Sequence, residues 1–212
     1  MITIYGRQNS SSVQLVMWAI NELGVKHQRL DYGHGHASTN TGDYLAMNPM
    51  GRVPVMLDGS VQMFESAAIL RYLGAKYGRD EFWPEDPTQR GPLDTWAEWG
   101  KNTFTEAVLE IFVYDVRLPP ATRDPEILAK ASERLTALAE MLDGRISDNE
   151  WIGGEDFTFA DIACGHILYR YFSLNWQRPE LENLSRYYDR LQKRPAFAEH
   201  VMVSYEALRG SY

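Results

Sequence analysis

The chain of 212 residues has only one cysteine, Cys164, so no intrachain disulfide can form. The absence of a Cys-x-x-Cys pair also excludes dithiol exchange on the protein itself. A reactive thiol needs an open, electropositive setting, and Cys164 lies in an apolar stretch with no basic residue beside it. We therefore interpret Cys164 as a buried structural residue. A single cysteine in the chain is consistent with a reducing compartment.

Positive charge and long apolar runs are also scarce. The chain has 21 Lys and Arg against 29 Asp and Glu, a formal net charge of −8. This balance argues against nucleic acid or an anionic membrane as the main partner. No apolar run is long enough for a membrane span, and the start Met-Ile-Thr-Ile-Tyr lacks the basic and apolar blocks of a signal peptide. We expect a cytoplasmic protein.

The first third of the chain alternates short strand and helix patterns. Strands are predicted at 2–6 and 27–31, helices at 13–23 and 43–47, a helix stop at Gly24, and a polar loop at 33–42. The order strand, helix, strand predicts a right-handed parallel crossover.

The stretch from Gly51 to Leu73 predicts a hairpin followed by a helix. Val53, Val55 and Leu57 alternate with other residues, as in a half-buried strand. Asp58-Gly59 predicts a tight turn, because Gly accepts positive φ without steric cost.

Pro54 stands out within this predicted strand, because proline removes a backbone donor. A cis bond at Pro54 turns the chain sharply and leaves the main chain of Val53 unpaired and facing outward. The next helix opens at Glu65-Ser66, and its first-turn N–H groups form a site for a carboxylate. A free strand-like edge beside such a helix start indicates a peptide-binding site.

The segment from Asn48 to Pro54 (Asn-Pro-Met-Gly-Arg-Val-Pro), followed by Glu65-Ser66, resembles the glutathione-binding part of the glutathione transferase superfamily. The resemblance implies a thioredoxin-like fold, a cis Pro54 and main-chain pairing of Val53 with the cysteinyl unit of glutathione. It also implies that Glu65 and Ser66 hold the γ-glutamyl end, and that two identical chains pack as a homodimer.

The glycyl carboxylate of glutathione needs a cation or amide donors. Arg52, next to Val53, is one candidate, and His36 is a second by analogy with the theta class. His34 and His36 lack further ligands at usable spacing, so we predict no metal site.

Glutathione chemistry needs the thiolate, which a protein stabilises with a hydrogen bond to sulfur and a helix N-terminus aimed at it. The loop after the first strand offers three consecutive hydroxyls, Ser10, Ser11 and Ser12. The theta and delta classes are similar in using a serine just past the first strand, which matches Ser10 when counted back from Gly24. We predict Ser10 as the main sulfur contact and Ser12 as the alternative. A helix N-cap is an equally ordinary role for these serines.

A related bacterial group, similar to the nu class, has Thr-x-Asn-x-x-Lys-Val in this loop. In the same register Ser10 replaces its Thr, Ser12 its Asn and Leu15 its Lys. This departure puts in doubt the disulfide reductase activity associated with that group.

The rest of the chain is predicted to be helical. A linker is predicted at 78–87, followed by two helices at 88–114 and 127–142 that pack antiparallel and are separated by a break at Pro119-Pro120. The next predicted helix starts with a Thr158–Asp161 capping box and has apolar positions from Ala160 to Phe172. Two further helices are predicted at 179–191 and 195–208. The chain thus divides into a thioredoxin-like α/β domain (1–77), the linker (78–87) and an all-helical bundle (88–212).

These features together predict a glutathione transferase that detoxifies small apolar electrophiles, with aromatic side chains near 104–114 and Tyr205 beside the second substrate. The alternatives are a glutathione-dependent disulfide reductase or peroxidase, and a non-catalytic module that binds glutathione or another protein.

Overall fold

The computed structural model of the chain describes residues 1–211 and opens with a four-stranded sheet. Its strands are β1 (Ile2–Tyr5), β2 (His27–Leu30), β3 (Val55–Asp58) and β4 (Val61–Phe64), in the order β2-β1-β3-β4. β1 pairs with β2 in parallel, and β3 pairs antiparallel with both β1 and β4. The predicted parallel crossover is confirmed, because α1 (Ser11–Glu22) connects β1 to β2.

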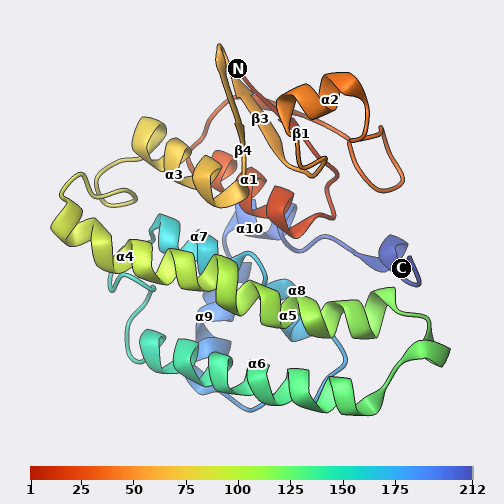
Figure 1. Cartoon of the computed structure of the whole chain (residues 1–212). Helices are drawn as coiled ribbons and strands as arrows, with labels where there is room; N and C mark the ends of the chain where they lie inside the picture. The colour runs from red at the N-terminus through yellow and green to blue at the C-terminus, as the bar shows by residue number, and fades with distance from the viewer. Residues whose placement is uncertain (212) are drawn as a thin grey trace.

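Three helices accompany the sheet. α1 and α3 (Ser66–Tyr77) lie between the sheet and the helices of the second half of the chain, while α2 (Gly42–Met47) lies away from those helices (Figure 1). Ile2, Ile4 and Met56 of the sheet are fully buried together with the apolar face of α1. This shared core fixes the start of α1 relative to β1 and β3.

Two glycines behave as the sequence predicts. Gly24 has a φ of 64° and follows α1, and its N–H donates to the carbonyl of Asn21, while the N–H of Val25 donates to that of Ile20. These two bonds form a Schellman motif, which satisfies carbonyls at the helix end. Gly59 has a φ of 61° at the first turn position of the β3–β4 hairpin.

The predicted strand through Val53 is shorter than expected, because β3 begins at Val55. Val53 and Pro54 precede it and stay outside the β-ladder. The expected alternation is also wrong, since Val55 and Met56 are both fully buried. Met56 faces the core with Ile4, its cross-strand partner, whereas Val55 lies opposite Tyr5 and Phe64 on the other face. Covering of both faces at this end removes the alternation of buried and exposed positions.

The second half of the chain is helical, and its first long helix changes type twice. It comprises α4 (Pro87–Trp99), the π-helical η1 (Gly100–Phe104), α5 (Thr105–Phe112) and the π-helical η2 (Val113–Arg117). The Thr105 hydroxyl donates to the carbonyl of Gly100 at 2.7 Å, five residues earlier. A Cβ at Gly100 would lie 2.6 Å from Sγ of Cys164, so glycine permits this close packing.

After the short 3₁₀ helix η3 (Pro120–Thr122), α6 (Pro125–Ile146) returns antiparallel to α4 and α5, as predicted (Figure 1). The chain ends with α7 (Phe159–Gly165), α8 (Leu168–Ser173), α9 (Glu182–Gln192), α10 (Pro195–His200) and the 3₁₀ helix η4 (Glu206–Leu208). The predicted Thr158–Asp161 capping box at the start of α7 is confirmed.

Three predicted helix extents are wrong. The stripe from Ala160 to Phe172 belongs to two helices, because His166 and Ile167 interrupt it. α9 starts three residues after the expected Pro179, and the last helix ends at His200 instead of residue 208. Beyond α10 the only helical segment in the described chain is the short 3₁₀ helix η4, and the ring of Tyr205 contacts that of Phe112, with centroids 5.3 Å apart.

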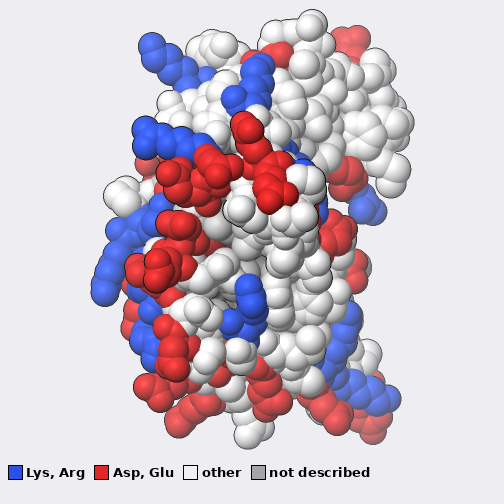
Figure 2. Space-filling model, turned by 90° about the vertical axis from the view of Figure 1, so that its left-hand side faces the viewer, with Lys and Arg blue, Asp and Glu red and all other residues white. Residues whose placement is uncertain are grey.

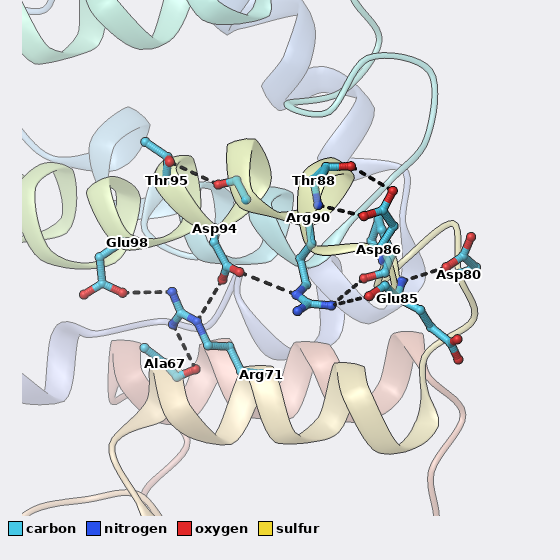
Figure 3. Close-up of polar contacts among 12 residues, drawn as sticks. Ala67, Arg71, Asp80, Glu85, Asp86, Thr88, Arg90, Asp94, Thr95 and Glu98 are labelled. Carbon is cyan, nitrogen blue, oxygen red and sulfur yellow. Dashed lines mark hydrogen bonds and ion pairs between the residues drawn. The ribbon is translucent and has the colours of Figure 1, made fainter.

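Charged side chains connect the two halves of the chain. On the side of the molecule shown in Figure 2, Lys and Arg lie interspersed with Asp and Glu. Between α3 and α4, Arg71 forms ion pairs with Asp94 at 3.0 Å and Glu98 at 2.8 Å (Figure 3). Residues 78–86 between these helices contain neither helix nor strand, and the predicted division into domains there stays a prediction. Within residues 1–211, no helix is both long and apolar enough to cross a membrane.

Candidate active site

The first loop and the segment before β3 lie against each other. A Cβ placed on Gly6 would lie 3.2 Å from Cβ of Val53 and 2.5 Å from a methyl carbon of Val13. Only glycine therefore allows this approach. A cavity of about 290 Å³ opens beside the contact, and it is lined by Arg7, Ser10, Gly33, His34, Thr39, Gly51, Arg52 and Val53. The serine loop and the Val53 edge thus share one cavity.

The Val53–Pro54 peptide bond is cis, as predicted. The main chain of Val53 forms no hydrogen bond within residues 1–211, so its N–H and C=O are free to pair with an extended ligand. The carbonyl of the preceding Arg52 accepts hydrogen bonds from the Tyr44 hydroxyl at 2.9 Å and from Nδ2 of Asn48 at 2.8 Å. Tyr44 and the buried Asn48 therefore hold this segment in place, a role that the sequence patterns did not assign to them.

Ser10 is the N-cap of α1, with φ of −85° and ψ of 123°. Its side chain makes no capping hydrogen bond, so the ordinary N-cap role leaves its hydroxyl unused. Ser10 is 9% exposed and lines the cavity beside Val53 and also a second cavity, described below. Ser11 lines only the second cavity, and the half-buried Ser12 lines neither.

Glu65 and Ser66 stand at the start of α3, next to Pro54. Because Val55 pairs with Phe64, Glu65 follows directly beside Pro54, although neither it nor Ser66 lines the two cavities. Glu65 is exposed and has a φ of 68°, a left-handed conformation that is uncommon for a residue with a Cβ. Ser66 is 2% exposed.

Lys101 of η1 is a site neighbour that the sequence patterns missed. Burial lowers the pKa of Lys101, and the negative charges of Glu65, Glu106 and Glu98 act in the opposite direction. The ammonium of Lys101 therefore lies within electrostatic reach of Glu65, at the point where the two halves of the chain meet. Its distance along the sequence from Glu65 gave no signal of this proximity.

The two candidates for a carboxylate contact are placed differently. Arg52 is exposed and lines the cavity beside Val53. His36 does not line it, whereas its neighbour His34 does. His36 instead contributes to lowering the pKa of Asp31, after the larger effect of the hydrogen bond from Arg29.

The second cavity, of about 170 Å³, lies between the start of α1 and the long helix. It is lined by Arg7, Asn9, Ser10, Ser11, Leu109, Phe112, Val113, Arg117 and Arg170. Leu109, Phe112 and Val113 come from the region predicted to wall a second substrate. The three arginines and Asn9 were not predicted, because they come from separate segments of the chain. Two larger hollows, of about 560 and 360 Å³, contain none of the predicted site residues.

Family comparisons agree with this geometry. The family model for the glutathione S-transferase N-terminal domain matches residues 1–75, and that for the C-terminal domain matches residues 104–195. The chain belongs to the glutathione S-transferase family. Glutathione is therefore its co-substrate, and the thioredoxin-like sheet followed by a helical domain is the fold of this family.

Individual glutathione S-transferases match over almost the whole chain. Glutathione S-transferase GstB of Escherichia coli K12 is 33% identical over 205 residues, which cover 96% of this chain and 99% of the relative. The theta class glutathione S-transferase of Xanthomonas axonopodis pv. citri with glutathione bound is 35% identical, with a TM-score of 0.90 and coverage of 96% of this chain and 98% of the other. Its apo form gives a TM-score of 0.82 at 33% identity, covering 96% and 97% of the two chains.

Proposed function

We propose that this glutathione S-transferase conjugates the glutathione thiolate to small electrophiles, and that the Ser10 hydroxyl stabilises the thiolate. One observation carries the proposal: Ser10 lines both cavities at the N-terminus of α1, and its hydroxyl makes no cap hydrogen bond. A hydroxyl in that position has a donor available for sulfur. The position of Ser10 in both cavities favours it over Ser12.

The cavity beside Val53 accommodates glutathione in this proposal. The free main chain of Val53 pairs with the cysteinyl unit, and Glu65 with the N–H groups at the start of α3 holds the γ-glutamyl end. Ser66 contributes to the same end, and the exposed Arg52 holds the glycyl carboxylate. The sulfur then lies at Ser10, where the two cavities meet.

The reaction needs no covalent intermediate on the protein. The thiol releases its proton to solvent, and the Ser10 hydroxyl and the positive end of α1 favour the anion that remains. The thiolate attacks an electrophilic carbon, a C–S bond forms, and the leaving group departs with the electrons of the broken bond. The acceleration comes from a larger population of thiolate and from its orientation toward a substrate in the second cavity.

Conjugation of glutathione to a generic aryl halide tests this proposal, together with retention on immobilised glutathione. We expect both retention and turnover. Retention without turnover would favour the non-catalytic binding module, and turnover only with a small mixed disulfide or a hydroperoxide would favour the reductase or peroxidase alternative. Failure of both assays would reject the proposal.

The remaining predictions accompany this function. We infer a homodimer acting in the cytoplasm in the detoxification of small, apolar electrophiles, and a division into residues 1–77, a linker at 78–87 and residues 88–212. The dimer is implied only by the resemblance to the glutathione transferase superfamily. Sedimentation at several protein concentrations tests it, and a molecular mass of one chain at all concentrations would contradict it.

A further inference from the structure

Three arginines surround the second cavity, and none of them has a carboxylate partner among the described residues 1–211. Arg7 comes from the first loop, Arg117 from the end of η2, and Arg170 from α8. No ion pair joins any of them to Asp or Glu within residues 1–211. The face in Figure 2 differs, because its basic side chains lie among acidic ones.

Arg170 is the most deeply buried of the three, at 4% exposed. One of its terminal nitrogens donates to the carbonyl of Asn9 at 2.8 Å, and its guanidinium lies 4.2 Å from the ring centroid of Phe112. Its Nε is buried and has no hydrogen-bond partner within residues 1–211. Burial, together with the positive charges of Arg117 and Arg7, lowers the pKa of Arg170 to about 9.

Two other polar atoms of residues that line the cavity also lack a hydrogen-bond partner. Nε of Arg7 and Oδ1 of Asn9 are buried, and neither has a partner within residues 1–211. The guanidinium of Arg117 lies 5.9 Å from the ring centroid of Phe112, and it makes no hydrogen bond or ion pair in the described part of the chain.

Two acidic residues close in sequence to the cavity-lining residues Leu109, Phe112 and Val113 have other partners. Asp115 pairs with Arg123 at 3.8 Å and accepts the N–H of Asn175 at 3.2 Å. Glu110 forms an ion pair with Arg134. A buried charge without an ionic partner is costly, and Arg170 is buried beside the half-buried Arg7 and Arg117. This cluster of positive charge indicates that an anion arrives from outside the described residues.

The position of the cavity identifies which molecule brings the anion. Glutathione uses the larger cavity beside Val53, and Ser10 and Arg7 line both cavities and so mark the boundary between them. Arg117 and Arg170 line only the second cavity, on the side from which an electrophile approaches the sulfur. The volume of about 170 Å³ is below the usual range of roughly 300–1,000 Å³ for pockets that bind drug-sized molecules.

We propose that the second substrate is a small electrophile carrying a carboxylate, which Arg117, Arg7 and Arg170 hold so that its reactive carbon faces the sulfur at Ser10. This inference rests on the proposed conjugation of glutathione, and it replaces the apolar electrophile that the sequence indicates with an anionic one. The apolar wall of Leu109, Phe112 and Val113 contacts the carbon skeleton, and the guanidiniums bind the carboxylate. In the reaction a C–S bond forms and the carbon–halogen bond of a halocarboxylate breaks, releasing halide with its electron pair.

Iodoacetate and iodoacetamide form the matched pair of probes, because they share the reactive carbon and the leaving group and differ in charge. We expect the ratio of kcat/KM for iodoacetate to that for iodoacetamide to exceed the ratio of the uncatalysed rates by about tenfold or more. A change of tenfold is the scale expected from a charge-assisted hydrogen bond. A ratio equal to the uncatalysed one would overturn the inference.

Arg117→Gln is the informative variant, because within residues 1–211 the Arg117 side chain makes no hydrogen bond or ion pair and only the distant contact with the Phe112 ring. We expect this variant to lower the iodoacetate to iodoacetamide ratio about tenfold, and Arg117→Lys to restore most of it. Arg79→Gln is the control, since Arg79 is exposed, lines neither cavity and carries the same charge. Equal ratios in Arg117→Gln and Arg79→Gln would contradict the inference.

Two further outcomes separate this inference from its foundation. If Arg117→Gln slows both reagents equally and raises the pKa of the bound glutathione thiol, the arginines serve the thiolate and the inference fails. If the wild-type protein conjugates neither reagent and no aryl halide, the proposed function itself fails. Turnover of iodoacetamide without preference for iodoacetate rejects only the anionic substrate.

Discussion

Removal of the Ser10 hydroxyl tests the catalytic proposal at a single atom. In the substitution Ser10→Ala the backbone of the N-cap stays in place, and the protein loses no capping hydrogen bond, because the Ser10 side chain makes none. We therefore expect the free energy of unfolding to fall by less than about 0.5 kcal/mol, below the usual effect of losing a serine N-cap.

The effect on bound glutathione should be much larger. A hydrogen bond to a charged acceptor contributes roughly 1.5–3 kcal/mol, and about 1.4 kcal/mol corresponds to one pKa unit. Ser10 is 9% exposed, so water replaces its hydroxyl poorly. Ser10→Ala should raise the pKa of the bound thiol by about 1–2 units, and turnover near neutral pH should fall about 10- to 100-fold.

Ultraviolet titration of the thiolate in the complex measures the pKa directly, and aryl halide turnover is measured on the same preparations. Ser12→Ala is the matched control, because Ser12 belongs to the same helix turn and lines neither cavity. The reasoning is refuted if Ser10→Ala leaves the thiol pKa unchanged, or if Ser12→Ala produces the larger shift.

Three other predictions concern the loop, the core and the pH dependence. Gly6→Ala places a Cβ 3.2 Å from that of Val53 and 2.5 Å from a Val13 methyl, so the KM for glutathione should rise several-fold, and an unchanged KM would count against the Val53 edge. Asp161→Ala removes the acceptor of two main-chain N–H groups and a tyrosine hydroxyl. Urea titration should show that the free energy of unfolding falls by about 3 kcal/mol, and a fall below about 1 kcal/mol would contradict the buried network. Burial and, secondarily, the charge of Lys101 lower the pKa of His166 to about 3, so the folded protein keeps it neutral while the unfolded chain binds a proton below about pH 6.5. Stability should therefore fall as pH drops through this window, by about 2 kcal/mol between pH 7.5 and pH 5, and a urea titration of His166→Gln should lack this part of the loss.

The sequence predicts the local elements well where one residue type decides the backbone. Gly24 ends α1, Gly59 turns the hairpin, and Thr158 with Asp161 starts α7, all as expected. The cis bond at Pro54 was implied by family resemblance and is confirmed. In these cases the determining interactions are local, so a short pattern is sufficient.

Short sequence patterns predict the structure less well where packing between distant segments determines burial and helix ends. The alternation at Val55 and Met56 failed because helices and aromatic rings cover both faces of the sheet there. The helix predicted to run to residue 208 ends at His200, and Tyr205 contacts Phe112 instead of continuing it. Both failures arise from contacts between residues far apart in the chain.

The candidate site shows the same division. Ser10, Arg52 and Val53 were found from short motifs, and the structure brings all three to one cavity. Arg7, Arg117 and Arg170 were missed, since no periodicity or spacing connects a loop, a π-helical turn and a helix of the bundle. The family motifs therefore indicate the residues of the proposed glutathione side, whereas the residues of the proposed second-substrate side are found only from the fold.

A crystal structure of the protein with glutathione bound is the most direct test of the central claim. We expect the sulfur within about 3.5 Å of Oγ of Ser10, with the cysteinyl main chain hydrogen-bonded to that of Val53. A sulfur held by Ser12 or pointing away from the first loop, with the main chain of Val53 still unpaired, would contradict it.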